Sequence, residues 1–273
     1  MIMQINDNVA VGDKFTLIAG PCMAESYDIC RQSAEFLIEC CRELDINYIF
    51  KASFDKANRS SGSTTRGPGL KKGLEFIRQI KSAYHVPVLT DVHECCQVEA
   101  VAEVADILQI PAFLCRQTDL LHAAADSGRV VNIKKGQFMA PEDMGGAIKK
   151  VQERGNNRVM LTERGFAFGY HNLIVDMRSL AIMRGFGVPV VFDATHSVQL
   201  PGGLGNASGG QRQFIRPLAR AAAGVGIDLL FAEVHPNPEA ALSDGPNSLN
   251  FDQARQLLQE VKVIYDLVKQ WEK

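Results

Sequence analysis

The chain has 273 residues, enough to bury a large core in one domain or two. Its 29 basic and 31 acidic residues give a formal net charge of -2, and neither sign runs in long blocks. This balance argues against nucleic acid or an anionic membrane as a main partner. No apolar segment approaches the ~20 residues that a bilayer span needs, and the first residues lack a secretory signal pattern. We therefore expect a cytoplasmic protein.

Eight short apolar runs alternate along the chain with longer segments of helical period. The runs, rich in Val, Ile, Leu and Phe, are 15–20, 47–53, 86–92, 105–111, 130–135, 158–163, 188–194 and 227–233. Continuous apolar runs are typical of parallel strands covered on both faces. Amphipathic patterns predict helices at roughly 25–44, 68–83, 94–104, 117–127, 141–154, 172–185, 212–225 and 252–271.

This alternation, without a break in composition, favours a single closed (β/α)8 TIM barrel. We expect one catalytic domain over residues 1–273, with residues 1–14 as a short N-terminal extension. A doubly wound open sheet is the alternative fold.

The seven cysteines include no C-x-x-C pair, and their odd number predicts reduced thiols. Six of them are interpreted as small buried residues on helices: Cys30, Cys40, Cys41, Cys95, Cys96 and Cys115. Cys22 differs because it lies in the turn AGPCMAES, residues 19–26, directly after an apolar run.

Functional side chains of such barrels gather where the strands end. Polar residues at or just after the predicted strand ends are Cys22, Lys51, Lys56, Asn58, Arg59, Ser60, Asp91, Glu94, Gln109, Lys134, Glu163, Arg164, Asp193, His196, Glu233 and Asp244. A single charge at a strand end is more often solvated than functional. Lys51, Gln109 and Lys134 differ, because each lies in or against an apolar run, where an unpaired ammonium or amide is costly. Their convergence predicts a site for a multiply charged anion.

Barrel closure would place the first strand beside the eighth, and the eighth beside the seventh. Cys22, His196, Glu233 and Asp244 could then meet as a sulfur, nitrogen and oxygen set suited to a divalent transition metal such as Zn²⁺, Fe²⁺ or Mn²⁺. No motif with metal-ligand spacing indicates such a site. From the residues alone, Cys22 is therefore either a metal ligand or a thiol packed in the core. His122 and His171 fall in predicted helices and are interpreted as surface or capping residues.

The basic residues near the strand ends require anionic partners, and phosphate and carboxylate are the natural ones. The run KANRSSGSTTRG, residues 56–67, predicts a phosphate cradle, with a solvated loop as the alternative. The run PGGLGNASGGQ, residues 201–211, lacks the glycine spacing of a dinucleotide site and is interpreted as a mobile lid.

A set of motifs closely resembles the 3-deoxy-D-manno-octulosonate 8-phosphate synthases. These are FKASFDKANRSS (50–61), LTDVHE (89–94), LQIPAFLCRQTDLL (108–121), NIKKGQF (132–138), TERG (162–165), FDATHSVQLPG (192–202), AEVHPNP (232–238) and LSDGPNSL (242–249). KANRSS separates this family from the related heptulosonate 7-phosphate synthases, which carry a K-P-R-T-S type segment there. The resemblance implies a transferase that condenses phosphoenolpyruvate, D-arabinose 5-phosphate and water, releases phosphate, and serves lipopolysaccharide (Kdo) biosynthesis.

The resemblance also implies roles for single residues. The metal-requiring branch of the family carries a cysteine at the position of Cys22, which implies Cys22, His196, Glu233 and Asp244 as metal ligands. The implied catalytic set is Cys22, His196, Lys134 and Asp244. The implied substrate-binding residues are Lys56, Gln109, Lys134 and Arg164 for phosphoenolpyruvate, Lys51 and Asp91 nearby, and Asn58, Arg59 and Ser60 for the arabinose phosphate. Arg116 and Phe113 are implied to reach a neighbouring subunit's site in a homotetramer.

Two other functions stay open on the residues. A Schiff-base aldolase would use a buried lysine, Lys51 or Lys134, as its nucleophile. A phosphosugar-binding or metal-sensing barrel would bind its ligands without turnover.

Overall fold

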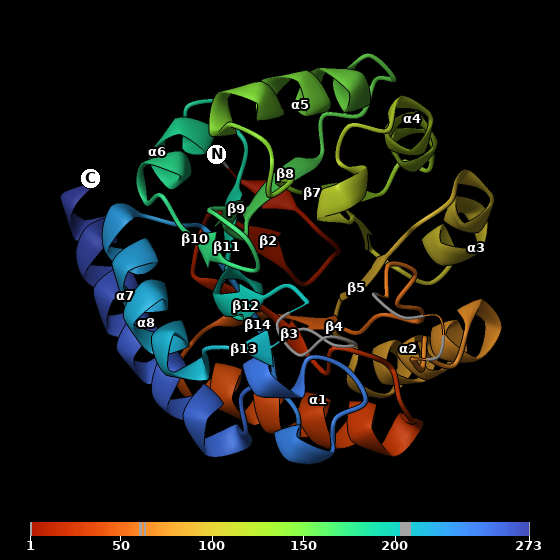
Figure 1. Cartoon of the computed structure of the whole chain (residues 1–273), viewed down its shortest axis with the longest axis horizontal. Helices are drawn as coiled ribbons and strands as arrows, with labels where there is room; N and C mark the ends of the chain where they lie inside the picture. Colours follow the sequence, from red (N-terminus) through yellow and green to blue (C-terminus); the bar gives the residue numbers. More distant parts are fainter. Residues whose placement is uncertain (1, 60–61, 63, 203–208, 273) are drawn as a thin grey trace.

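Eight parallel strands form a closed barrel in the computed structural model, which describes residues 2–59, 62, 64–202 and 209–272 (Figure 1). The strands are β3 (Thr16–Gly20), β4 (Asn47–Lys51), β5 (Val88–Asp91), β6 (Ile107–Ile110), β7 (Val130–Lys134), β8 (Val159–Glu163), β11 (Val190–Asp193) and β14 (Leu229–Glu233). The ring closes because β14 pairs with β3 on one side and with β11 on the other. The predicted (β/α)8 barrel is confirmed, and the open sheet is excluded.

Helices surround the ring of strands (Figure 1). They are α1 (Tyr27–Glu43), α2 (Leu70–Tyr84), α3 (Val98–Ala102), α4 (Thr118–Asp126), α5 (Met144–Gln152), α6 (Arg178–Arg184), α7 (Ile215–Val225) and α8 (Phe251–Trp271). Each covers a strand with an apolar face, as α1 does with Leu37 and Cys40. No helix of the described residues is both long and apolar enough to cross a bilayer.

The predicted helix at 172–185 begins too early. Its first residues form β10 (Leu173–Ile174), which pairs antiparallel with β9 (Phe166–Ala167). The turn between these strands contains Gly169 and His171 with positive φ angles of 79° and 54°, which a helix cannot accommodate. The prediction that His171 lies on a helix is therefore wrong, whereas His122 does lie in α4.

Two cysteines also differ from their prediction. Cys95 and Cys96 are exposed, whereas Cys30, Cys40, Cys41 and Cys115 are buried. The exposed pair belongs to a 3-10 turn, Cys95–Gln97, that precedes α3, and the buried face of α3 is supplied instead by Val98 and Val101.

An N-terminal hairpin closes one end of the barrel. Its strands, β1 (Met3–Gln4) and β2 (Ala10–Val11), pair antiparallel. Its apolar side chains join a buried cluster with the barrel interior, formed by Met3, Ile5, Val9, Val11, Ile18, Ile49, Leu89, Ile107, Val130, Met160, Val191, Leu229 and Phe231. Figure 1 shows β2 near the centre of the ring. The expected extension is thus part of the core, and it fills the end of the barrel where the strands begin.

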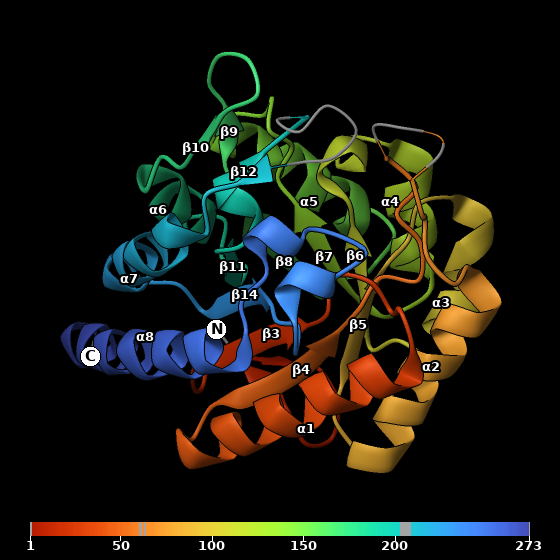
Figure 2. The same cartoon turned by 60° about the horizontal axis from the view of Figure 1, so that its bottom comes forward.

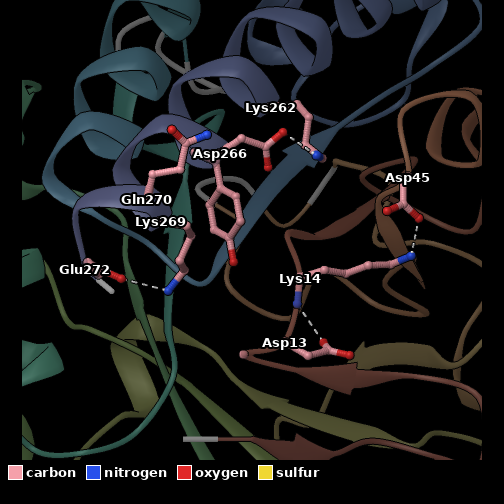
Figure 3. A pocket seen from close by; sticks show the side chains of 10 residues that line it. Asp13, Lys14, Asp45, Lys262, Asp266, Lys269, Gln270 and Glu272 are labelled. Carbon is pink, nitrogen blue, oxygen red and sulfur yellow. Dashed lines mark hydrogen bonds and ion pairs between the residues drawn. The ribbon is translucent and has the colours of Figure 1, made fainter.

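A shallow hollow lies at this N-terminal end, beside the C-terminal half of α8 (Figure 3). Its charged side chains pair with one another: Lys14 with Asp45 at 2.5 Å, Lys262 with Asp266 at 2.6 Å and Lys269 with Glu272 at 2.9 Å. Because these charges neutralise each other at the surface, the hollow offers little to an anionic ligand.

The opposite end of the barrel carries additional short strands. β12 (Gln199–Leu200) pairs with β13 (Gly209–Gly210), and both follow β11 in the chain. Figure 2 shows β9, β10 and β12 together on one side of the molecule, away from the end of α8. These elements follow β8 and β11 in the chain and flank the mouth on that side.

Helix α8 begins with a capping box. Asn250 Oδ1 accepts a hydrogen bond from the Gln253 amide at 2.8 Å, and Gln253 Oε1 accepts one from the Asn250 amide at 3.1 Å. We expect Asn250→Ala to lower the free energy of unfolding by about 1 kcal/mol. In a protein of this size that loss lowers Tm by about 2–4 °C. Thermal melting measures it, with the exposed Gln270→Ala as the control that should melt like the parent protein. An unchanged Tm for Asn250→Ala would contradict the capping role.

Candidate active site

Three possible metal ligands meet where β3 and β14 end. Cys22 follows β3 by two residues, and Glu233 is the last residue of β14, in register with Gly20. Asp244 lies in the loop after β14 with a left-handed backbone, φ 51°. Their ligand atoms lie within 4.8 Å of one another, and Cys22 Sγ is 3.1 Å from Asp244 Oδ2. Barrel closure therefore brings together residues that are more than 200 positions apart in sequence.

His196 stands beside this set of three. It begins the 3-10 helix His196–Val198 after β11, and its Nε2 is 3.4 Å from Glu233 Oε1. Its Nδ1 lies 2.8 Å from Asp193 Oδ2. The Asp193 carboxylate thus fixes the ring so that Nε2 faces Glu233, although His196 lies outside the group of three whose ligand atoms are within 4.8 Å of one another.

The site fits a divalent cation. Glu233 Oε2 is buried and has no hydrogen-bond partner among the described residues, a costly state that a bound cation would relieve. Burial, together with the charge of Glu233, raises the pKa of the Cys22 thiol well above its ordinary value. A bound cation would offset this effect and favour the thiolate. A thiolate, two carboxylates and a nearby imidazole would then form a donor set that Zn²⁺, Fe²⁺ and Mn²⁺ accept.

Lys51 supports the same set. Its side chain is 1% exposed, and its ammonium lies 3.2 Å from Glu233 Oε1 and 3.1 Å from the carbonyl oxygen of Cys22. Lys51 is therefore the counter-ion of a buried carboxylate, which explains how an ammonium is tolerated inside an apolar run.

A cavity of about 460 Å³ opens directly beside these residues. Its wall contains cations from several strand ends. The polar members among the sequence-predicted residues are Lys56, Asn58, Arg59, Asp91, Glu94, Lys134, Arg164, His196 and Asp244. Candidate metal ligands and basic residues therefore face one space.

Two of the cations are buried in this wall. Lys134 lies 2.6 Å from Asp193 Oδ2, so Asp193 contacts both Lys134 and His196. Burial alone would raise the pKa of Asp193, but His196 and Lys134 lower it below its ordinary value. Arg164 is 4% exposed, and its Nη1 has no hydrogen-bond partner among the described residues. A buried guanidinium with a free donor is a strong attractor for a phosphate or carboxylate.

Gln109 belongs to a hydrogen-bonded ladder across the barrel interior. Its amide nitrogen donates to Asp91, and its amide oxygen accepts from Asn132 at 3.0 Å. Asn132 in turn accepts from Thr162 Oγ1 at 2.8 Å. Burial opposes the charge of Asp91, yet Lys51 and Lys56 lower its pKa below the usual range. Both ends of the Gln109 amide are thus engaged inside the barrel.

Of the remaining predicted residues, some line the cavity and others do not. Asn58 and Arg59 line it, and Arg59 Nη2 donates to the Leu242 carbonyl oxygen at 3.2 Å. Ser60 lies outside the described residues, as does most of the predicted lid at 201–211. Phe113 is 54% exposed and lines the cavity of its own chain, whereas Arg116 is exposed and not part of the wall. Their reach into a neighbouring subunit stays a prediction.

Four polar residues of the wall were not predicted: Asp55, His93, Gln137 and Gln199. His93 follows Asp91 by two residues, and Gln137 follows Lys134 by three. His93 Nδ1 and Gln137 Oε1 are buried without a hydrogen-bond partner among the described residues. Reading the first four residues after each strand would have found His93 and Gln137. Gln199 lies six residues beyond Asp193, and its place in the wall becomes evident only from its contacts in the folded structure.

Comparison with known proteins fits this geometry. Residues 2–270 match the model of the DAHP synthetase I family. A relative from Cyanothece sp. is 56% identical over 264 residues, covering 96% of this chain and 97% of its own. Relatives from Desulfotalea psychrophila and Fusobacterium nucleatum are 58% and 55% identical, covering 92% and 98% of this chain and 89% and 99% of their own. All three are named 2-dehydro-3-deoxyphosphooctonate aldolase. The family expected from the motifs is confirmed: the chain belongs to the DAHP synthetase I family, with the 2-dehydro-3-deoxyphosphooctonate aldolases.

Proposed function

We propose that the protein condenses phosphoenolpyruvate with D-arabinose 5-phosphate and water. The products are 3-deoxy-D-manno-octulosonate 8-phosphate and inorganic phosphate, within lipopolysaccharide (Kdo) biosynthesis in the cytoplasm. The names of the relatives support this eight-carbon product. The observation that carries the proposal is the shared cavity: buried cations for an enol phosphate line the same space as Asp244, whose ligand atom lies within 4.8 Å of those of Cys22 and Glu233.

The basic residues of the wall would bind phosphoenolpyruvate. Lys134 and Arg164 hold its phosphate and carboxylate, because each places a buried positive charge at the cavity. Lys56, which lines the same cavity, adds a third cation. Asn58 and Arg59, which line the cavity, hold the phosphate of the sugar. Ser60, outside the described residues, is proposed for the same subsite. Two anchored phosphates at opposite ends align C3 of one substrate with C1 of the other, which removes much of the entropic barrier to C–C bond formation.

The candidate metal set completes the site. Cys22, His196, Glu233 and Asp244 would hold a divalent transition metal, Zn²⁺, Fe²⁺ or Mn²⁺. When bound, such an ion supplies Lewis acidity for an aldehyde or a water molecule. Lys51 balances the charge of Glu233, and Asp193 holds both His196 and Lys134 in place.

A homotetramer of single-domain chains is the proposed assembly. The exposure of Phe113 at the mouth of the cavity supports a contact with another subunit there. Light scattering on the purified protein would give the mass of the assembly.

One assay separates the proposed reaction from its alternatives. We expect phosphate release from phosphoenolpyruvate that depends on D-arabinose 5-phosphate. A preference for erythrose 4-phosphate would instead identify a heptulosonate synthase, and ligand binding without phosphate release would identify a binding protein. Borohydride should trap no substrate on Lys51 or Lys134, whereas a trapped adduct would identify a Schiff-base aldolase.

A further inference from the structure

Gln199 lies between the two halves of the site. Its amide nitrogen donates to Asp244 Oδ1 at 2.9 Å, and its amide oxygen accepts from Arg164 Nη2 at 3.0 Å. The backbone of Gln199 is fixed by the pairing of β12 with β13, where it stands opposite Gly210. One side chain thus connects a candidate metal ligand with a cation of the anion subsite.

Asp244 and Arg164, the two partners of Gln199, each have a second polar atom that Gln199 does not contact. Asp244 turns Oδ2 toward Cys22, at 3.1 Å from the sulfur. Arg164 keeps a buried Nη1 without a partner among the described residues. Gln199 thus holds one atom of each group: Asp244 Oδ2 faces Cys22 and also accepts from Ser243 Oγ at 3.2 Å, whereas Arg164 Nη1 is left for a ligand. The amide therefore sets how the carboxylate and the guanidinium are presented.

We propose that Gln199 is a positioning residue that couples the two subsites, so that phosphoenolpyruvate strengthens cation binding and the cation strengthens phosphoenolpyruvate binding. This inference rests on the proposed function. A ligand on Arg164 fixes the guanidinium, the guanidinium fixes the amide, and the amide fixes Asp244 in the orientation that faces Cys22. Linkage requires the two effects to be equal, since each ligand must change the affinity of the other by the same factor.

The amide suits this role better than a charged group would. It donates on one side and accepts on the other, so a single orientation satisfies both Asp244 and Arg164. A carboxylate at position 199 could accept from Arg164 but could not donate to ionised Asp244. A thioether of similar length could do neither.

Binding measurements test the coupling. Metal-stripped protein is titrated with Mn²⁺ by calorimetry, without and with saturating phosphoenolpyruvate, and then with phosphoenolpyruvate without and with Mn²⁺. We expect the parent protein to bind each ligand about tenfold more tightly in the presence of the other, within the usual range for coupled sites. Gln199→Met should lower this factor several-fold. Gln152→Met is the control, because it makes the same replacement at an exposed residue of α5 outside the cavity, and it should keep the factor.

Gln199→Glu provides the second variant, should Gln199→Met fail to fold. It should also lose the coupling, because its carboxylate cannot donate to Asp244. A parent-like coupling factor in either folded variant would overturn the inference, and so would a parent protein that binds both ligands independently. Failure of the parent protein to bind Mn²⁺ or phosphoenolpyruvate at all would count against the proposed function itself.

Discussion

Replacing Lys134 by methionine is expected to lower kcat/KM for phosphoenolpyruvate by about a thousandfold. The side chain supplies a buried positive charge at the cavity wall, 2.6 Å from Asp193. A preorganised donor of this kind, aimed at charge that develops in the reaction, contributes about 10²–10³ in rate. The loss also removes one of the contacts that hold Asp193, whose other side-chain partners are His196 and Thr195, so the imidazole becomes less well positioned. Steady-state kinetics with both substrates measure the effect.

Two controls separate a site effect from unfolding. Lys149→Met removes an exposed lysine of α5 and should keep the parent kinetics. Circular dichroism should show that Lys134→Met keeps the helical content of the barrel. A folded Lys134→Met enzyme with kcat/KM within a few-fold of the parent value would show that Lys134 does not bind the enol phosphate.

Removal of divalent cations by chelation is expected to lower activity by at least about a hundredfold, since a bound metal contributes several kcal/mol and each 1.4 kcal/mol is tenfold in rate. Addition of Zn²⁺, Fe²⁺ or Mn²⁺ should restore it. The expectation rests on the unpartnered Glu233 Oε2 and on the approach of Cys22 to Asp244. Full activity in demonstrably metal-free protein would exclude a metal role.

Cys22→Asn tests the sulfur ligand directly. We expect this variant to lose stoichiometric metal, as measured by elemental analysis, with at most part of its activity kept. Cys96→Asn changes an exposed cysteine outside the cavity and should keep the metal content of the parent protein. Undiminished metal in the Cys22→Asn protein would show that Cys22 is no ligand.

The strands of the barrel could be predicted because their signal is local. Each is a continuous apolar run, and the eight predicted runs match the barrel strands within a few residues at each end. The β9–β10 hairpin could not be found this way, because Leu173 and Ile174 also fit the apolar pattern of the helix that follows. Only the turn residues, with positive φ at Gly169 and His171, separate the two.

The sequence could predict which residues belong to the site, but not which of their side chains contact each other. Strand ends converge in any closed parallel barrel, so Cys22, Glu233 and Asp244 could be brought together from their order alone. Which acid pairs with which lysine depends on side-chain direction: Lys51 meets Glu233, whereas Lys134 meets Asp193. The bridge through Gln199 depends on a two-residue strand outside the barrel, and nothing in the local sequence marks it.

The hairpin of β1 and β2 has a kinetic consequence. Its buried side chains fill the end of the barrel where the strands begin. In the part of the chain that the structure describes, the cavity is therefore closed at that end and opens only where the strands end. Substrates must then enter, and products leave, through the same opening. Inorganic phosphate, the smaller product, must leave past any sugar product that still occupies the opening. The barrel fold therefore imposes an order on product release.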